Sequence, residues 1–143
     1  MFSDFKKFKG QVTRTNGERV EAINSGATEL VAGDAVTIDV STNNIIAVKK
    51  ATTADVVCGF VISEVVNKKF KQGDMLTYAD CGTYIYLVAD GAIASGDKLM
   101  LAADGVAEWE AAVSPNPDPQ VIGRAVNAAA DEGLVEVKLL INE

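Results

Sequence analysis

Short stretches of apolar residues recur along this chain, and glycine, aspartate and asparagine separate them. Between Ala35 and Val40 apolar and polar residues alternate, so that Val36, Ile38 and Val40 share one face, as in a half-buried strand. No segment shows a strong helical period. We therefore expect an all-β fold, a compact barrel or sandwich of many short strands. The other predicted strands include 29–31, 45–48, 56–66, 75–78, 83–88, 99–102, 106–109, 120–128 and 134–141.

The first 23 residues differ from the rest of the chain. Residues 1–20 carry a net charge of +3, whereas the whole chain of 143 residues carries −7. Asn16-Gly17 lies between β-forming residues and is typical of a tight hairpin, although that hairpin would place Arg14 opposite Arg19. We expect residues 1–23 to form a basic N-terminal arm with a hairpin, and residues 24–143 to form a β-barrel-like domain.

Two segments of the chain resemble each other. Gly33-Asp34 begins an apolar strand, and Gly59 opens a later one 26 residues on; Gly96-Asp97 begins another, and Gly123 follows 27 residues on. This near-equal spacing predicts one supersecondary unit used twice in a pseudo-symmetric barrel. Independent use of the same turn residues would give the same match.

Charge and composition exclude several classes of function. An acidic chain is a poor partner for nucleic acid, which requires a basic face. No apolar run approaches the length of about 18 residues that a membrane helix needs, and the N-terminus has no signal-peptide pattern. The chain has no histidine, and Cys58 and Cys81 are far apart, so we expect no metal or cofactor. Both cysteines are predicted to be buried free thiols, which fits synthesis in a reducing compartment.

A few side chains suggest chemistry, each with a structural alternative. Asp34, Asp74 and Asp97 follow glycines at turns, so they could bind a hard cation or act in a hydrolase, but aspartate commonly caps turns through its own backbone. Nothing resembles a nucleophile with its base, and we expect no enzyme. Aromatic side chains could form a sugar-stacking platform or pack in a core or subunit interface; these are Tyr84, Tyr86 and Trp109.

All three prolines of the chain lie in one loop, Ser114 to Pro119. Each proline lacks a backbone donor and favours extended geometry in the residue before it. The pattern predicts a semi-rigid surface loop, where partner contacts are common. The candidate contact residues of this loop are Pro115, Pro117 and Pro119.

The turn and strand spacing of residues 24–142 resembles that of small structural proteins of tailed phages. The segments that carry the likeness are Gly96-Asp97-x-Leu99, Asp104-Gly105, 121–129, 132–139 and the upstream Gly33-Asp34 and Cys58-Gly59-Phe60. These relatives are head decoration or capsid-stabilising proteins, some described as capsid fibres. The resemblance implies a compact β-barrel-like domain, commonly a homotrimer, on the outer capsid surface.

The resemblance and the charge pattern together lead to one functional expectation. The chain would be a capsid decoration or cement subunit, made in the host cytoplasm, that binds the major capsid protein on the head exterior. Its N-terminal arm would order on docking, with phenylalanines as anchors and lysines facing acidic capsid surface. The alternative is a carbohydrate-binding or other adhesion module. The candidate capsid-binding residues of the arm are Phe2, Phe5, Lys6, Lys7, Phe8 and Lys9.

Overall fold

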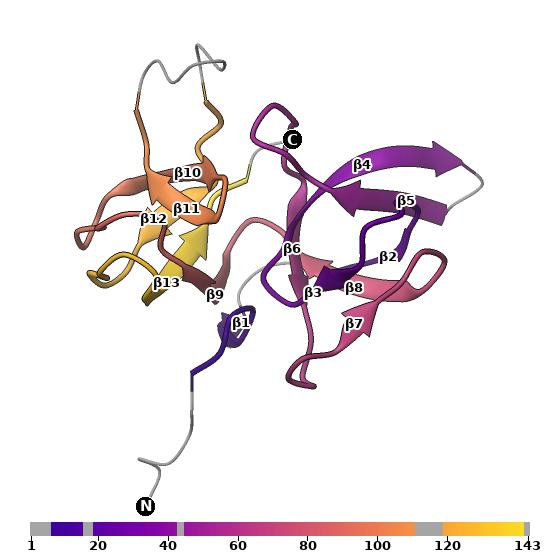
Figure 1. The fold of residues 1–143 in the computed structure, drawn as a ribbon, viewed down its shortest axis with the longest axis horizontal. Helices are drawn as coiled ribbons and strands as arrows, with labels where there is room; N and C mark the ends of the chain where they lie inside the picture. Colours follow the sequence, from indigo (N-terminus) through magenta and orange to yellow (C-terminus); the bar gives the residue numbers. More distant parts are fainter. Residues whose placement is uncertain (1–6, 16–18, 43–44, 111–118, 142–143) are drawn as a thin grey trace, which may run out of the picture.

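The computed structural model describes residues 7–15, 19–42, 45–110 and 119–141, and in this part of the chain every regular element is a β-strand. The all-β prediction is therefore confirmed (Figure 1). The strands are β1 (Val12–Thr15), β2 (Arg19–Asn24), β3 (Leu30–Val31), β4 (Ala35–Thr42), β5 (Ile45–Lys50), β6 (Gly59–Ile62), β7 (Lys69–Phe70), β8 (Met75–Ala79), β9 (Thr83–Val88), β10 (Lys98–Ala102), β11 (Gly105–Glu108), β12 (Gly123–Ala125) and β13 (Leu134–Leu139).

The strands form two units that follow each other in the sequence. The first unit, residues 19–79, is a closed barrel with the strand order β2-β5-β4-β6-β8, and the short β3–β7 pair lies beside it. The second unit, residues 83–139, has the order β9-β13-β12-β10-β11, and β1 extends this sheet on the free edge of β9. A parallel bridge between Ala89 and Val106 brings the end of β9 next to β11. The second unit therefore curls toward closure in the same way as the first.

The two units share their register as well as their strand order. In the first, β6 returns against β4 with Val36 opposite Gly59; in the second, β12 returns against β10 with Leu99 opposite Gly123. The turns before β4 and β10 also match: each aspartate accepts a hydrogen bond from a backbone N–H three residues earlier, at 2.9 Å, from Val31 to Asp34 and from Ala94 to Asp97. The predicted sequence repeat is therefore a repeat of structure.

Gly59 and Gly123 serve the same purpose in the two units. A Cβ atom at Gly59 would lie 2.3 Å from the Tyr78 ring on β8, and one at Gly123 would lie 2.6 Å from the carbonyl oxygen of Lys138 on β13. Both distances are below van der Waals contact, so only glycine allows the return strand to approach its neighbour this closely. Glycine at position 59 therefore meets a steric requirement of the first unit, and the repeat extends this requirement to Gly123.

The structure corrects three local predictions. The hairpin expected around Asn16-Gly17 does not form from its flanking strands: β1 pairs with β9, and β2 pairs with β5 and β8. Pairing with separate partners also keeps Arg14 away from the position opposite Arg19. The predicted strand 56–66 is regular only over β6, because Ser63 begins a turn that its hydroxyl closes on Val65.

The third correction concerns β4. A register shift between Ile38 and Val40 interrupts its pairing with β5, so the strict alternation predicted for this strand fails and Ile38 is 44% exposed. The division of the chain after residue 23 stays a prediction. Strand β2, which is part of the barrel, crosses that position.

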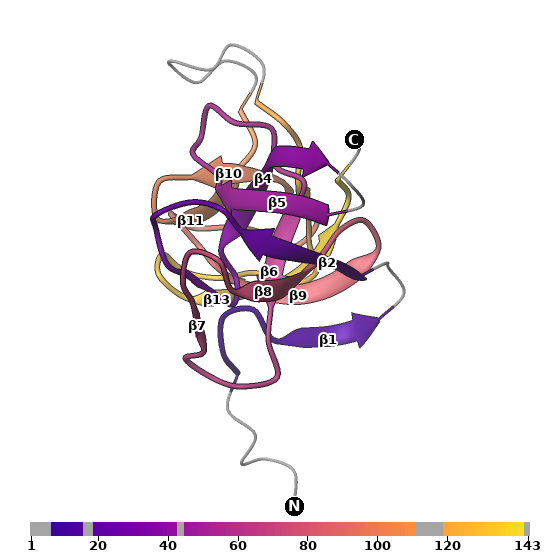
Figure 2. The ribbon, with the colours of Figure 1, turned by 90° about the vertical axis from the view of Figure 1, so that its right-hand side faces the viewer.

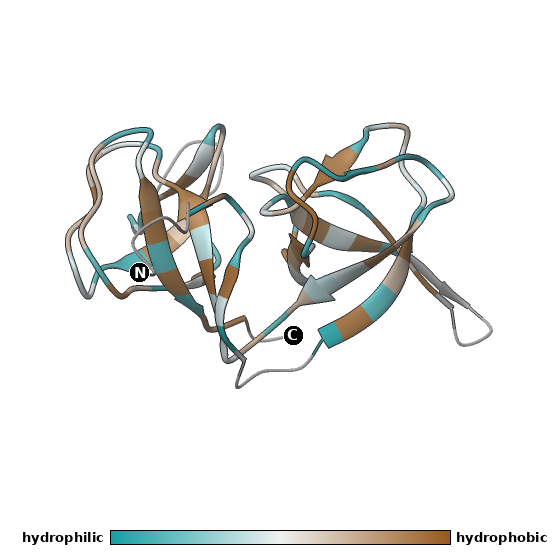
Figure 3. Ribbon diagram, turned by 90° about the horizontal axis from the view of Figure 1, so that it is seen from below, coloured by the Kyte–Doolittle hydropathy of each residue, from teal (hydrophilic) through white to brown (hydrophobic). Residues whose placement is uncertain are grey.

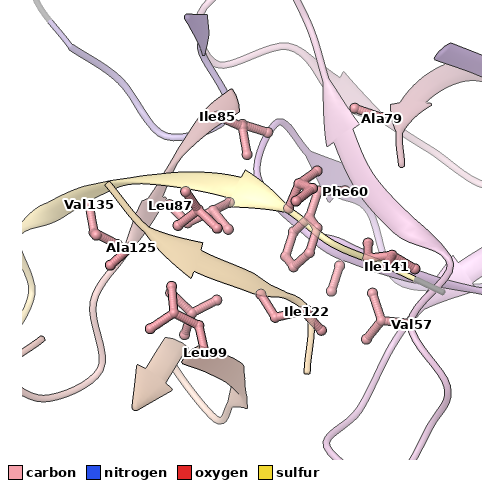
Figure 4. Packing of buried hydrophobic residues seen from close by; sticks show 14 of the residues in the cluster. Val57, Phe60, Ala79, Ile85, Leu87, Leu99, Ile122, Ala125, Val135 and Ile141 are labelled. Atoms are coloured by element: carbon pink, nitrogen blue, oxygen red, sulfur yellow. The ribbon is translucent and has the colours of Figure 1, made fainter. Parts of the chain in front are cut away.

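Two hydrophobic cores hold the molecule together. The smaller lies within the first unit and includes Leu30, Val36 and Tyr78. The larger joins the two units: Phe60 of β6 packs with Ile85, Leu87 and other residues of the second unit (Figure 4). Phe60 is 1% exposed. Because this one cluster is built from both units, burial of its apolar surface couples them.

Polar and apolar residues alternate on the strands of both units, as the banded colouring of Figure 3 shows. On β9 the buried side chains are Thr83, Ile85 and Leu87, while Tyr84 and Tyr86 face outward and are half-buried. The sheet of the second unit therefore has one face in the shared core and one outer face. Strand β1 lies along the edge of this sheet, apart from the barrel strands (Figures 1 and 2).

Candidate functional site

The candidate arm residues divide into two groups. Phe2, Phe5 and Lys6 lie outside the described residues, whereas Lys7, Phe8 and Lys9 lie within them. The Lys7 ammonium sits over the ring of Tyr86, 5.3 Å from its centroid. Phe8 is half-buried and makes a turn, since Gln11 N donates to the Phe8 carbonyl at 3.1 Å. From residue 7 onward the arm therefore lies against the body of the protein.

Lys9 and Gly10 join the arm to both units. Lys9 Nζ forms an ion pair with Asp34 Oδ1 of the first unit at 3.1 Å. Gly10 N donates to the Tyr86 carbonyl of the second unit at 2.7 Å, and Tyr86 N donates to the Gln11 carbonyl at 3.0 Å. A side chain at Gly10 would collide with Ala32, and its φ of +85° also favours glycine. Residues 7–11 therefore form a strap that contacts both units, and the charge of Lys9 is paired within the molecule.

A cleft of about 600 Å³ opens beside this strap. Phe8 and Arg14 line it on the side of β1, and Arg19, Ile62 and Glu64 line it on the side of the barrel. Its walls are therefore of mixed character, with an aromatic ring, two guanidinium groups and one carboxylate. Its lining also includes the hydroxyl of Ser63, which donates to the Val65 carbonyl and accepts from the Val65 N–H.

The proline loop is held firmly at its base. Pro115 and Pro117 lie outside the described residues, but Pro119 is buried and its carbonyl accepts a hydrogen bond from Trp109 Nε1 at 2.7 Å. The Gln120 side chain then pairs with the backbone of Val57, accepting from its N–H at 2.7 Å and donating to its carbonyl at 2.9 Å. Gln120, which the sequence did not single out, thus joins the loop to the first unit.

The aromatic side chains considered for sugar binding do not form one platform. Tyr84 and Tyr86 share the outer face of β9, but Trp109 lies at the opposite edge of the sheet, beyond β13, β12 and β10. Cations also occupy these rings: Arg14 lies 5.0 Å from the centroid of Tyr84, and Lys98 lies 4.6 Å from that of Trp109. Since sugar stacking needs open ring faces, this arrangement does not favour the carbohydrate-binding alternative.

The turn aspartates cap turns. Asp34, Asp74 and Asp97 each accept a hydrogen bond from the backbone N–H three residues earlier. Within the described ranges no three histidine, cysteine, aspartate or glutamate side chains are grouped as metal ligands would be. The hard-cation hypothesis is therefore not supported for the described residues.

The two cysteines have different environments. Cys58 is buried and forms no disulfide bond, as predicted, but Cys81 is exposed, so the prediction that Cys81 is buried was wrong. The reason is its place in the turn between β8 and β9, where the chain passes from one unit to the other at the surface.

The described residues form no helix that is long and apolar enough to cross a membrane.

Comparison with solved structures gives the fold a relative. The crystal structure of the head fiber gp8.5 N base in bacteriophage phi29 superimposes with a TM-score of 0.58 and 19% sequence identity. The match covers 88% of this chain and 98% of the other. At this identity the likeness concerns the fold. A comparison with curated proteins gives no match.

The comparison with protein families gives the more specific result. A family model described as XM1 gp53 minor capsid protein matches residues 3–139. The match includes the strap, both units and the proline loop, which is nearly the whole chain. This agrees with the resemblance to phage head proteins that the turn and strand spacing indicated. The chain therefore belongs to the XM1 gp53 minor capsid protein family.

Proposed function

We propose that this phage capsid-associated protein is a decoration subunit that binds the major capsid protein on the outer surface of the head and stabilises the shell. The observation that carries the proposal is that the family match extends over the two units and their strap, the fold match covers 88% of the chain, and both lead to proteins of the phage head. The phi29 relative is described as the N base of a head fiber.

The charge of the chain supports an exterior position. With a net charge of −7 the protein would be repelled by packaged DNA, whereas an acidic surface facing solvent favours solubility. Cement activity in this proposal is mechanical: a folded subunit that bridges neighbouring capsid proteins adds binding free energy to the assembled shell. A homotrimer would allow one particle to bridge several capsid subunits at once, and we include it in the proposal.

The arm retains its proposed role in a narrower form. Because Lys9 pairs with Asp34, the residues before it are the better candidates for contacting the capsid. Deleting residues 1–6 removes Phe2, Phe5 and Lys6 while leaving the strap intact. We expect this deletion to weaken capsid binding without changing the thermal unfolding midpoint, and unchanged binding would remove the arm from the proposal.

The experiment that tests the proposal uses capsids assembled without this protein. Purified full-length chain is added, and the particles are separated by sedimentation, imaged by cryo-electron microscopy and challenged by heat. We expect density on the outer surface and a higher temperature of shell disruption. Absence of binding, or density on the inner surface, would refute the proposal. Light scattering of the free chain tests the trimer against the 15.0 kDa mass of the monomer.

A further inference from the structure

The basic residues of the C-terminal part of the chain are gathered in one place. Residues 80–143 contain three basic residues against eleven acidic ones, and the three are Lys98, Arg124 and Lys138. In the β-sheet, Lys98 of β10 lies opposite Arg124 of β12, and Arg124 lies opposite Lys138 of β13. Every cation of this strongly acidic part therefore stands in a single line across three neighbouring strands.

The line continues in both directions to aromatic residues. Lys138 lies opposite Tyr84 of β9, which in turn lies opposite Arg14 of β1. At the other end, the backbone N–H of Trp109 donates to the Lys98 carbonyl at 2.8 Å, which places Trp109 beside Lys98. The result is one row that crosses all six strands, about 24 Å at the usual strand spacing. We call it the cationic row, and its members are Trp109, Lys98, Arg124, Lys138, Tyr84 and Arg14.

The cationic row lowers the stability of the protein when no partner is bound. Like charges directly opposite each other on neighbouring strands repel, and three cations in succession do so twice. Ion pairs in the described residues join Lys9 to Asp34 and Lys49 to Asp39, and none involves a member of the row. Glu136, two residues from Lys138 on the same strand, accepts a hydrogen bond from the Thr13 hydroxyl. The repulsion is therefore not balanced by ion pairs within the described chain.

The aromatic residues hold the cations in position. Tyr84 lies between Arg14 and Lys138, whose charged groups are 5.0 and 5.9 Å from its ring centroid. Trp109 holds Lys98 at 4.6 Å, and Arg124 donates to the Gly96 carbonyl at 3.1 Å. Each long side chain thus has a fixed place before any partner arrives. Such pre-organisation lowers the entropy that binding would otherwise cost.

We propose that the cationic row is a docking surface for an acidic stretch of protein, and specifically for carboxylate groups on the outer surface of the capsid. The inference rests on the proposed function and names the second contact made by the same subunit. Charge complementarity carries it: a line of unpaired cations on an otherwise acidic half-molecule fits a narrow line of carboxylates. A broad anionic surface would also meet the acidic residues around the row and be repelled.

Two observations favour protein over nucleic acid or glycan as the partner. Trp, Tyr and Arg are the residue types that carry most binding energy in protein–protein interfaces, and the row contains all three. Bases and sugars bind by stacking on open aromatic faces, but the faces of Tyr84 and Trp109 are occupied by the cations of the row itself. Carboxylates need only the cations.

The test compares two variants that lose the same charge. One carries Lys98→Gln, Arg124→Gln and Lys138→Gln; the control carries Lys68→Gln, Lys69→Gln and Lys71→Gln, three exposed lysines of the first unit. The probes are poly-L-glutamate, polyphosphate of matched charge, and capsids that lack the protein. We expect the row variant to lose roughly tenfold in affinity for poly-L-glutamate and for capsids, with strong salt dependence in the parent, and the control to change less than about twofold.

Several results would overturn the inference. They are a parent that does not bind poly-L-glutamate, equal losses in the row variant and the control, or a preference for polyphosphate. Capsid binding that survives in the row variant would overturn the docking role while leaving the decoration proposal standing. Conversely, a parent that binds poly-L-glutamate through the row but never binds capsids would refute the decoration proposal and the capsid as the partner, and would leave the row only as a carboxylate-binding surface. Arg124→Gln alone removes no described ring contact and only the exposed hydrogen bond to the Gly96 carbonyl, so it tests the same row with less change to the protein.

Discussion

The two units of this protein are built on one plan but differ in how their edges are used. The first closes its barrel completely and keeps a small core of its own around Leu30 and Tyr78. The second shares its core with the first and adds β1 at its edge. The difference shows that a repeated fold can divide its tasks: the first copy supplies a self-contained body, and the second supplies a sheet whose outer face is free for contacts.

The largest effect should come from the shared core. Truncating Phe60 to alanine leaves a cavity between the units, at a cost of about 4 kcal/mol. Trp109 is the single tryptophan of the chain, so its fluorescence reports on the second unit. In urea titrations we expect Phe60→Ala to shift this fluorescence transition strongly. Leu30→Ala alters only the core of the first unit and should still shift this transition, by less, because coupled units unfold together; no shift at all would show that the shared core does not couple the units.

The paired glycines test whether the two copies are equivalent. Gly59→Ala and Gly123→Ala each force a methyl group into a space that is already occupied, so each should cost about 2 to 3 kcal/mol of unfolding free energy. Gly73→Ala is the matched control. Its Cβ would meet nothing within 4 Å, and it should cost only about 1 kcal/mol for the φ of +93°. A mild Gly123→Ala would indicate that the second unit adapts more readily than the first.

Substitution of the corner aspartates, Asp34 and Asp97, should lower the stability of the protein by different amounts in the two units. Asp34→Ala removes a turn cap and the ion pair with Lys9, so we expect a loss of about 2 kcal/mol; Asp97→Ala removes the cap alone, at about 1 kcal/mol. Both values come from denaturant unfolding. Lys9→Met measures the ion pair in a double-mutant cycle with Asp34→Ala, and additive losses in that cycle would mean that the strap gains nothing from it.

The smallest effect concerns pH and the first unit. Asp55 accepts hydrogen bonds from the Thr52 backbone N–H and hydroxyl, and the backbone bond in particular lowers the pKa of the Asp55 carboxyl. A lowered pKa in the folded state stabilises the protein above the usual aspartate range and loses that stabilisation as the pH falls through the lowered value. We expect Asp55→Asn to remove this small stabilisation at neutral pH and to change stability little at acid pH, where the parent has lost it too. The plot of stability against pH therefore becomes slightly flatter across the acid range. An equal change at neutral and acid pH would contradict this origin.

Several features of the fold were predictable from sequence because they depend on local chemistry. The repeat could be predicted from the Gly-Asp corners and from the glycines at 59 and 123. Turn geometry restricts the residue type at the corners, and the close approach of a neighbouring strand restricts it at the two glycines. The alternation on β9 places Tyr84 and Tyr86 on one face of the strand, but it did not show which face is buried. These features depend on residues that are close in the sequence or equally spaced along it, so they are visible in a single sequence.

Long-range pairing was not predictable in this way. The hairpin signal at Asn16-Gly17 was strong, but β1 gains more by extending the sheet at β9, some 70 residues later, than by pairing with β2. The cationic row shows the same limit, because its members come from five strands and from the residue that follows β11. A sequence signal did exist: only three basic residues occur after residue 79. Their alignment became visible only with the register.

The placement of β1 also has a consequence for the order of events during synthesis. The strands of the first unit all lie within residues 19–79, so this barrel can close while the second unit is still in the ribosome. Strand β1 leaves the ribosome first but has no partner until β9 follows, and Lys9 can meet Asp34 long before then. The growing chain therefore carries an unpaired N-terminal strand tethered to a finished barrel until β9 emerges, and that pairing then joins parts of the polypeptide that lie some 70 residues apart.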